Sequence, residues 1–150
     1  MRVFQGIDDV ESAVGEHLGH SDWLEITQDR VNLFADATGD HQWIHVDPER
    51  AAQGPFGAPI AHGYLTLSLL PKLGAELMRV DGVNLVINYG LNKVRFPQPV
   101  KVGAKVRVGG EIVSVEHTKQ GAQVVVKYTI EIEGADKPAC VAETVRVLVS

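Results

Sequence analysis

The sequence predicts an α+β fold in which one long sheet packs around one buried helix. The segment from His62 to Leu70 is apolar on nearly every face, which is typical of a buried helix. From Val83 onward, apolar and polar residues alternate as they do in antiparallel strands with one buried face. Helices first and strands afterwards favour a layered α+β architecture. The chain of 150 residues contains no repeat or linker, so one domain over residues 1–150 is expected.

The amino-terminal part carries the signals of two helices and a short strand. Residues 8–18 are compatible with a helix that stops at a glycine, Gly19. Residues 23–26 are a candidate for a short strand. Residues 27–39 begin with a capping threonine, follow helical spacing and end with a glycine. We therefore expect Asp40 to lie just beyond the carboxyl end of this second helix.

Prolines mark the ends of elements in the middle of the chain. Asp47-Pro48 is typical of a helix start, because proline is tolerated at the first helical position. A bend rich in glycine and proline follows over residues 54–59, just before the buried helix. Pro71 would not usually be tolerated inside a helix, so we expect a kink or break between Leu67 and Leu70.

The carboxyl-terminal half is expected to supply most of the sheet. Apolar and polar residues alternate over residues 126–133 and again over residues 141–149. The alternation that starts at Val106 and Val108 changes phase before it continues farther along the same segment. The Gly109–Gly110 pair in between predicts a bulge or a tight bend.

Charge and composition exclude several kinds of partner. The net charge of −5 disfavours binding to a nucleic-acid backbone. The long uncharged stretch over residues 51–71 contains too many prolines and glycines to be a lipid-facing helix. The amino terminus lacks the apolar stretch of a secretory signal, and the single cysteine, Cys140, agrees with a reducing compartment. We expect a cytoplasmic protein with neither nucleic acid nor membrane as a partner.

Five basic residues gather within a short segment of the expected sheet. They could receive one small phosphorylated ligand, although solvated strand faces would show the same pattern. The residues are Lys93, Arg95, Lys101, Lys105 and Arg107.

Ionisable side chains crowd into residues 40–62, and residues 40–45 are the densest part. Asp40 and His45 could share one water molecule, the carboxylate accepting a proton while the imidazole delivers one. A packed, helix-ending turn would contain the same residue types. His41 and His45 are four apart, as in some zinc sites, but no glutamate follows His41. No metal site is therefore expected.

Gly63 stands at the expected start of the buried helix. Its N–H would be one of the unpaired donors of the first turn, and such donors can stabilise a developing oxyanion. A glycine that only makes room for packing would look the same in the sequence.

Taken together, these segments resemble the MaoC-like dehydratases, or (R)-specific enoyl-CoA hydratases, and most closely the subgroup named nodulation protein N. The resemblance covers nearly all of the chain after Ser21. The segments that carry it are residues 37–40 (Ala-Thr-Gly-Asp), 39–45 (Gly-Asp-His-Gln-Trp-Ile-His), 44–48 (Ile-His-Val-Asp-Pro), 54–57 (Gly-Pro-Phe-Gly), 59–65 (Pro-Ile-Ala-His-Gly-Tyr-Leu) and 95–103.

The resemblance implies a hotdog fold, in which a curved antiparallel sheet wraps a long central helix, and a homodimer. It implies reversible syn hydration of a trans-2-enoyl-CoA to a (3R)-hydroxyacyl-CoA by a hydro-lyase. Asp40 would accept a proton from the water, His45 would pass one to C2, and the N–H of Gly63 would bind the thioester oxygen. No cofactor is implied, because coenzyme A is part of the acyl-CoA substrate.

Two features depart from this family pattern or extend it. Gln42-Trp43 stands where the hydratases commonly have Asn-Pro. Gln42 can still donate a hydrogen bond to the substrate, while the bulk of Trp43 is expected to narrow or redirect the acyl pocket. Asn92 occupies a position where the family often has a polar strand residue near the active-site histidine, so it is a further candidate.

Two other functions remain open. A hotdog acyl-CoA thioesterase often carries a carboxylate on its central helix, and this sequence has no acidic residue between Gly63 and Ala75. An acyl-CoA-binding or regulatory protein that lost turnover is favoured only by the Gln42-Trp43 pair.

Overall fold

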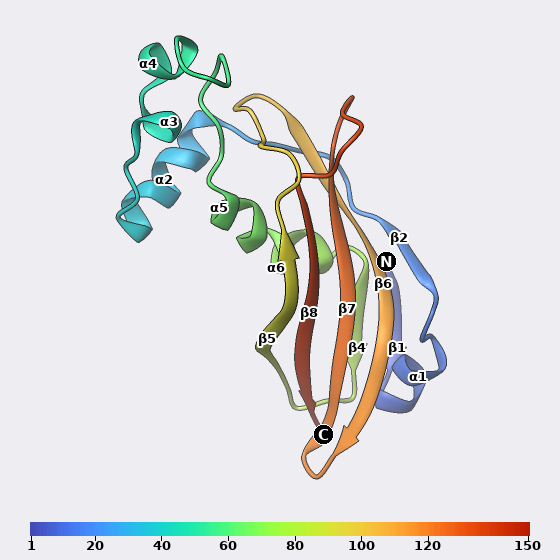
Figure 1. Cartoon of the computed structure of the whole chain (residues 1–150). Coiled ribbons are helices and arrows are strands. Elements are labelled where there is room, and N and C mark those ends of the chain that lie inside the picture. Colours follow the sequence, from blue (N-terminus) through green and yellow to red (C-terminus); the bar gives the residue numbers. More distant parts are fainter.

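The structure, a computed structural model, describes residues 1–150 and confirms the α+β arrangement (Figure 1). Its main sheet is antiparallel, and the five strands β2, β6, β7, β8 and β5 follow one another in that order, while β3 pairs with β6. These strands are β2 (His17–His20), β3 (Leu24–Glu25), β5 (Leu85–Arg95), β6 (Lys105–Thr118), β7 (Gly121–Ile132) and β8 (Cys140–Val149). A separate parallel pair joins β1 (Arg2–Gln5) to β4 (Met78–Asp81).

Six short helices complete the chain. They are α1 (Ile7–Ser12), α2 (Gln28–Thr38), α3 (Trp43–Val46), α4 (Pro48–Ala52), α5 (Gly63–Ser68) and α6 (Leu70–Gly74). The expected caps are confirmed, since the side chain of Thr27 accepts a hydrogen bond at the start of α2 and that of Asp47 does so at the start of α4. None of these helices combines the length and the apolar character that crossing a bilayer requires.

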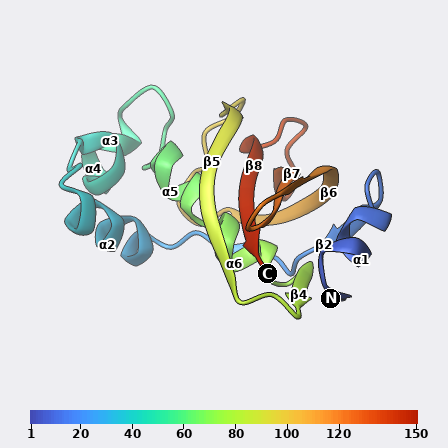
Figure 2. The same cartoon turned by 90° about the horizontal axis from the view of Figure 1, so that it is seen from below.

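The buried helix is divided as Pro71 predicts. Helix α5 ends at Ser68, and α6 restarts at Leu70 with Pro71 in its first turn, where the missing N–H removes no hydrogen bond from within α6. The central helix is thus two short helices rather than one long one. Figures 1 and 2 show both pieces beside the curved sheet. Leu65 and Leu73 belong to one apolar core that also contains residues from β6, β7 and β8.

Two predictions about individual elements are wrong. The first helix ends at Ser12 instead of continuing to residue 18, because residues 17–20 form β2 and pair with the long strand β6. The bulge in β6 lies between Ile112 and Ser114 rather than at the glycine pair. Gly109 and Gly110 stay in register with β7, where a Cβ at either position would meet a neighbouring side chain at 3.1 Å.

Strand β5 forms an edge of the sheet. It pairs with β8 on one side only, and nearly all of its residues are exposed. Its large apolar side chains are 41–67% exposed, a high value for residues of a long strand: Leu85, Val86, Ile87, Tyr89 and Leu91. The protein therefore presents an unpaired, apolar strand edge.

Candidate active site

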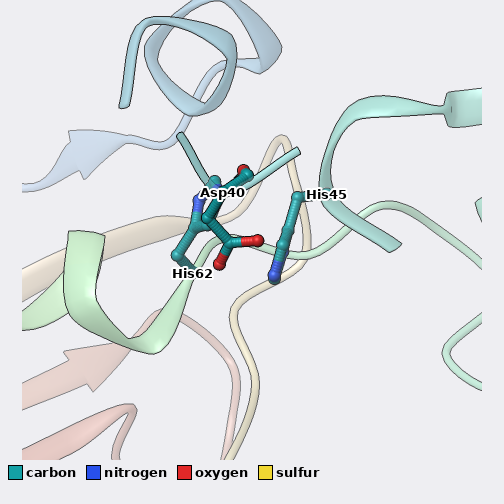
Figure 3. A group of neighbouring side chains, drawn as sticks. All are labelled: Asp40, His45 and His62. Atoms are coloured by element: carbon teal, nitrogen blue, oxygen red, sulfur yellow. The ribbon is translucent and has the colours of Figure 1, made fainter. Parts of the chain in front are cut away.

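Asp40 lies where the sequence predicts it, just past the end of α2. Gly39 ends that helix in the left-handed conformation (φ 83°), which lets the chain turn sharply. The Asp40 carboxylate is exposed and accepts a hydrogen bond from the N–H of Gln42 at 3.3 Å. Figure 3 shows the carboxylate directed toward the ring of His45.

His45 is carried by α3 and is 7% exposed. Its Nδ1 lies 2.6 Å from the carbonyl oxygen of Ile60. Because a carbonyl only accepts hydrogen bonds, Nδ1 carries a hydrogen, and Nε2 is the nitrogen left for a ligand. Burial lowers the pKa of His45 below 6.5, and the neighbouring His62 lowers it further, while the bond to Ile60 and the charge of Asp40 oppose the shift.

The structure brings the side chains of Asp40 and His45 together. One carboxylate oxygen of Asp40 and one ring nitrogen each of His45 and His62 lie within 4.8 Å of one another. A single water molecule can bridge two such atoms, since each hydrogen bond spans about 2.8 Å. The arrangement can therefore hold one water between a carboxylate and an imidazole.

A cavity of about 220 Å³ opens beside His45 and includes Gly63 in its wall. Gly63 is the first residue of α5, so its N–H has no partner within the helix. A Cβ on Gly63 would lie 3.3 Å from the ring of Phe96. The remaining lining residues are Phe56, Ile60, Ala61, Thr66, Gln98, Pro99, Val100 and Ala139. The wall is mainly apolar apart from His45, Thr66 and Gln98.

The side chains of Gln42 and Asn92 do not reach this cavity. Gln42 is exposed at the residue before α3, where its backbone carbonyl accepts the N–H of His45 at 3.0 Å. Asn92 is exposed on the edge strand β5, in a stretch where the pairing with β8 is irregular. Neither residue lines the cavity, and their contact with a substrate stays a prediction.

Trp43 also lies apart from the cavity beside His45, so the structure gives no support to the expected effect on the acyl pocket. Its ring stacks under the guanidinium of Arg50 at 4.3 Å. A Cβ at Gly54 would approach the same ring to 2.9 Å, so the indole packs tightly against the backbone there. Because Trp43 packs against α4 and the following turn, it does not narrow the cavity beside His45.

His62 is the site residue to which the sequence assigned no role. It is 2% exposed, its Nε2 donates to the backbone carbonyl of Asp40 at 3.0 Å, and its ring stacks on that of His45. The sequence places His62 among the crowded histidines, but only the folded chain brings it from the start of α5 to the end of α2.

Two groups of side chains have the composition of a metal site. Asp40, His45 and His62 form the first, although one nitrogen of each histidine is already bonded to a backbone carbonyl. The second, Asp8, Glu11 and His117, is exposed. A hydrogen bond from His117 to Glu11 raises the pKa of that imidazole, which makes it a poorer metal ligand. The absence of a metal from the reaction stays a prediction.

Comparison with known proteins identifies the relatives of this chain. The model of the MaoC like domain matches residues 9–134. The 3-hydroxyacyl-thioester dehydratase Z of Mycobacterium tuberculosis is 60% identical over 146 residues, which cover 97% of this chain and 97% of that protein. The nodulation protein N of Rhizobium leguminosarum bv. viciae is 46% identical over 145 residues, which cover 93% of this chain and 89% of that protein.

Solved structures support the same relationship. The (R)-hydratase from A. caviae involved in PHA biosynthesis superposes with a TM-score of 0.75 at 27% sequence identity, covering 90% of this chain and 96% of that chain. The divided central helix packed against a curved antiparallel sheet is the hotdog fold that the sequence resemblance implied.

Proposed function

Because this chain belongs to the family of MaoC-like dehydratases, we propose that it hydrates trans-2-enoyl-CoA thioesters reversibly to (3R)-hydroxyacyl-CoA. The relatives named above include a dehydratase and a hydratase, and this chain is a hydro-lyase of the same family. The observation that carries the specific reaction is the convergence of Asp40 and His45 beside a cavity whose wall contains Gly63.

The protonation of His45 suggests the path of the proton. With its pKa lowered, His45 is neutral near pH 7, and Nε2 can accept a proton from the bound water as the water oxygen bonds to C3. The imidazolium then returns that proton to C2 on the same face, which gives syn addition and restores the neutral ring. The Asp40 carboxylate accepts a hydrogen bond from the second O–H of the water, whose hydrogen stays on the oxygen as part of the new 3-hydroxyl, and it stabilises the transient imidazolium. In this route His45 takes the proton that the sequence-based hypothesis assigned to Asp40.

The thioester oxygen needs a hydrogen-bond donor during this reaction. As the water adds to C3, the electrons of the double bond shift toward the thioester carbonyl, and negative charge grows on its oxygen. Gly63 lines the same cavity as His45 and begins α5, so its N–H, which has no partner within the helix, is the donor that we assign to this oxygen. Donors of this kind contribute about 10²–10³-fold to the rate of such reactions.

Part of the basic segment supports a coenzyme A substrate. Lys101 and Arg95 are exposed and flank the residues from Phe96 to Val100 that form one side of the cavity. Arg107, in contrast, is bonded to Glu131 at 2.8 Å and packs over a tryptophan. Because Lys101 and Arg95 lie next to this side of the cavity and form no ion pair, they are the members of the segment that we expect to attract the phosphates of coenzyme A.

The unpaired edge at β5 supports a homodimer. Pairing of β5 with the same strand of a second copy would continue the sheet and bury the exposed apolar side chains. The mass of the protein in solution at micromolar concentration tests this proposal, and a monomer would contradict it.

A cytoplasmic location stays a prediction that rests on the single cysteine, Cys140, which is buried and free.

A hydration assay across chain lengths tests the proposed reaction. Short, medium and long trans-2-enoyl-CoA esters should lose their enoyl absorbance, and the product should be the (3R) alcohol. Release of free thiol without hydration would instead identify a thioesterase. Tight acyl-CoA binding without turnover of any ester would identify a binding protein.

The proposed proton path also predicts the pH dependence of the rate. Because the neutral form of His45 is the active one, kcat/KM for hydration should rise as the pH increases through the His45 pKa and stay level above it. The midpoint should lie below 6.5, since burial lowers this pKa. Initial rates from about pH 5 to about pH 8.5 measure the profile. A rate that falls above this midpoint would instead show that the protonated imidazole is the active form.

A further inference from the structure

We propose that His62 is a positioning residue that ties the Asp40 segment to the start of α5 and supports the ring of His45. This inference rests on the proposed hydration, because it concerns the same carboxylate and imidazole. It assigns a role to a buried side chain that is not part of the wall of the cavity.

The first contact links two parts of the chain that are 22 residues apart. The Nε2–H of His62 donates to the backbone carbonyl of Asp40 at 3.0 Å. Asp40 lies two residues after the end of α2 and belongs to no helix or strand, so no ladder of backbone hydrogen bonds holds it. The bond to His62 therefore holds the backbone of Asp40, from which the carboxylate extends, close to the start of α5.

The second contact is with the other reacting group. The rings of His62 and His45 are 3.9 Å apart between centroids and are inclined by 24°, so they stack (Figure 3). The Nδ1 of His45 is held by Ile60 at one edge of its ring. Stacking on His62 limits the rotation of the His45 ring, so Nε2 of His45 stays directed toward the water.

The buried polar atoms of His62 indicate that packing alone does not explain this residue. Nδ1 of His62 is inaccessible to solvent and has no hydrogen-bond partner. An unpaired buried acceptor is destabilising, and an apolar ring of similar shape would avoid it. The ring of Phe34 already packs against His62, with the centroids 4.9 Å apart, so the surroundings suit an apolar ring. The histidine instead supplies a donor to the backbone carbonyl of Asp40.

Two substitutions separate the hydrogen bond from the ring. His62→Phe keeps a ring that can stack on His45 but removes the donor to Asp40. We expect kcat for enoyl-CoA hydration to fall about 10²-fold, the cost of displacing a reacting group by about 1 Å, while KM changes little. His62→Gln places an amide N–H near the position of Nε2 but has no ring to stack on His45, so it should recover part of the lost kcat.

His41→Phe provides the matched control. His41 is adjacent to Asp40 in sequence, but its ring is exposed and bonded to Asp36 at 2.8 Å. This variant should keep kcat within about 3-fold of the parent, because no reacting group depends on it. The proposal is overturned if His62→Phe keeps kcat in the same range, or if His62→Gln is as impaired as His62→Phe.

An NMR titration of His45 in the free protein supplies a readout that does not depend on turnover or on the folding of His62→Phe. The ring of His62 helps to bury His45 and adds a like charge when it is protonated. In His62→Gln the pKa of His45 should therefore rise toward 6.5, whereas an unchanged pKa would count against the proposal. If the parent protein hydrates no ester, the proposed function fails, and the titration still decides the contact between the two rings.

Discussion

His45→Ala and Asp40→Asn should each leave a folded protein whose hydration of trans-2-enoyl-CoA is at least about 10²-fold slower. His45→Ala removes the nitrogen that carries the proton from the water to C2, so its effect should be the larger. Asp40→Asn keeps the shape of the side chain but removes the charge that orients the water and stabilises the imidazolium. Steady-state rates with one good ester measure both effects.

His41→Ala is the control for these two variants. It removes an imidazole between the two positions in sequence, but from an exposed ring that contacts Asp36. Its rate should remain close to that of the parent. Thermal unfolding of all three proteins shows whether a lost rate reflects a lost fold. Near-normal turnover in a folded His45→Ala or Asp40→Asn protein would refute the assigned site.

Gly63→Pro should lower kcat by about 10²–10³-fold, because it removes the backbone N–H that binds the thioester oxygen. The backbone can accept this change. Gly63 is the first residue of α5, where proline is tolerated, and His62 has φ −59° and ψ 139°, a conformation that suits the residue before a proline. A ring carbon of the proline would stand where the amide hydrogen was, so the oxyanion would lose its donor.

Gly63→Ala distinguishes the loss of the N–H donor from the effect of the added side-chain carbon. Both substitutions place a Cβ about 3.3 Å from the ring of Phe96, but alanine keeps the N–H. The alanine variant should therefore be much more active than the proline variant in the same assay. Equal rates in the two variants would mean that the N–H of Gly63 does not bind the oxyanion.

The local features of the fold were predictable from short stretches of sequence. Thr27 and Gly39 delimit α2, and Pro71 divides the central helix, because a cap or a proline acts on the residues next to it. Long-range pairing was less predictable. Residues 17–20 have helical neighbours but join β6, since backbone hydrogen bonds to a strand about ninety residues away outweigh a weak local preference.

The candidate site was likewise predictable in part from the sequence. The types and spacing of residues 40–63 were enough to single out Asp40, His45 and Gly63, and the structure brings Asp40 and His45 together and places Gly63 beside His45. Gln42 and Asn92 had polar side chains of the right kind, but their side chains lie outside the cavity. The type of a residue determines which hydrogen bonds its side chain can form. The directions of the Gln42 and Asn92 side chains depend on how α3 and β5 pack.

The sequence by itself determined the α+β class, the family and the chemical groups available for catalysis, because these follow from composition, periodicity and motif. Only the tertiary structure decided which side chains meet. His62 acts on Asp40 and His45 through a hydrogen bond and a stacked ring, and both contacts require that the start of α5 pack against the end of α2. Contacts of this kind join segments far apart in the chain, so no local sequence pattern predicts them.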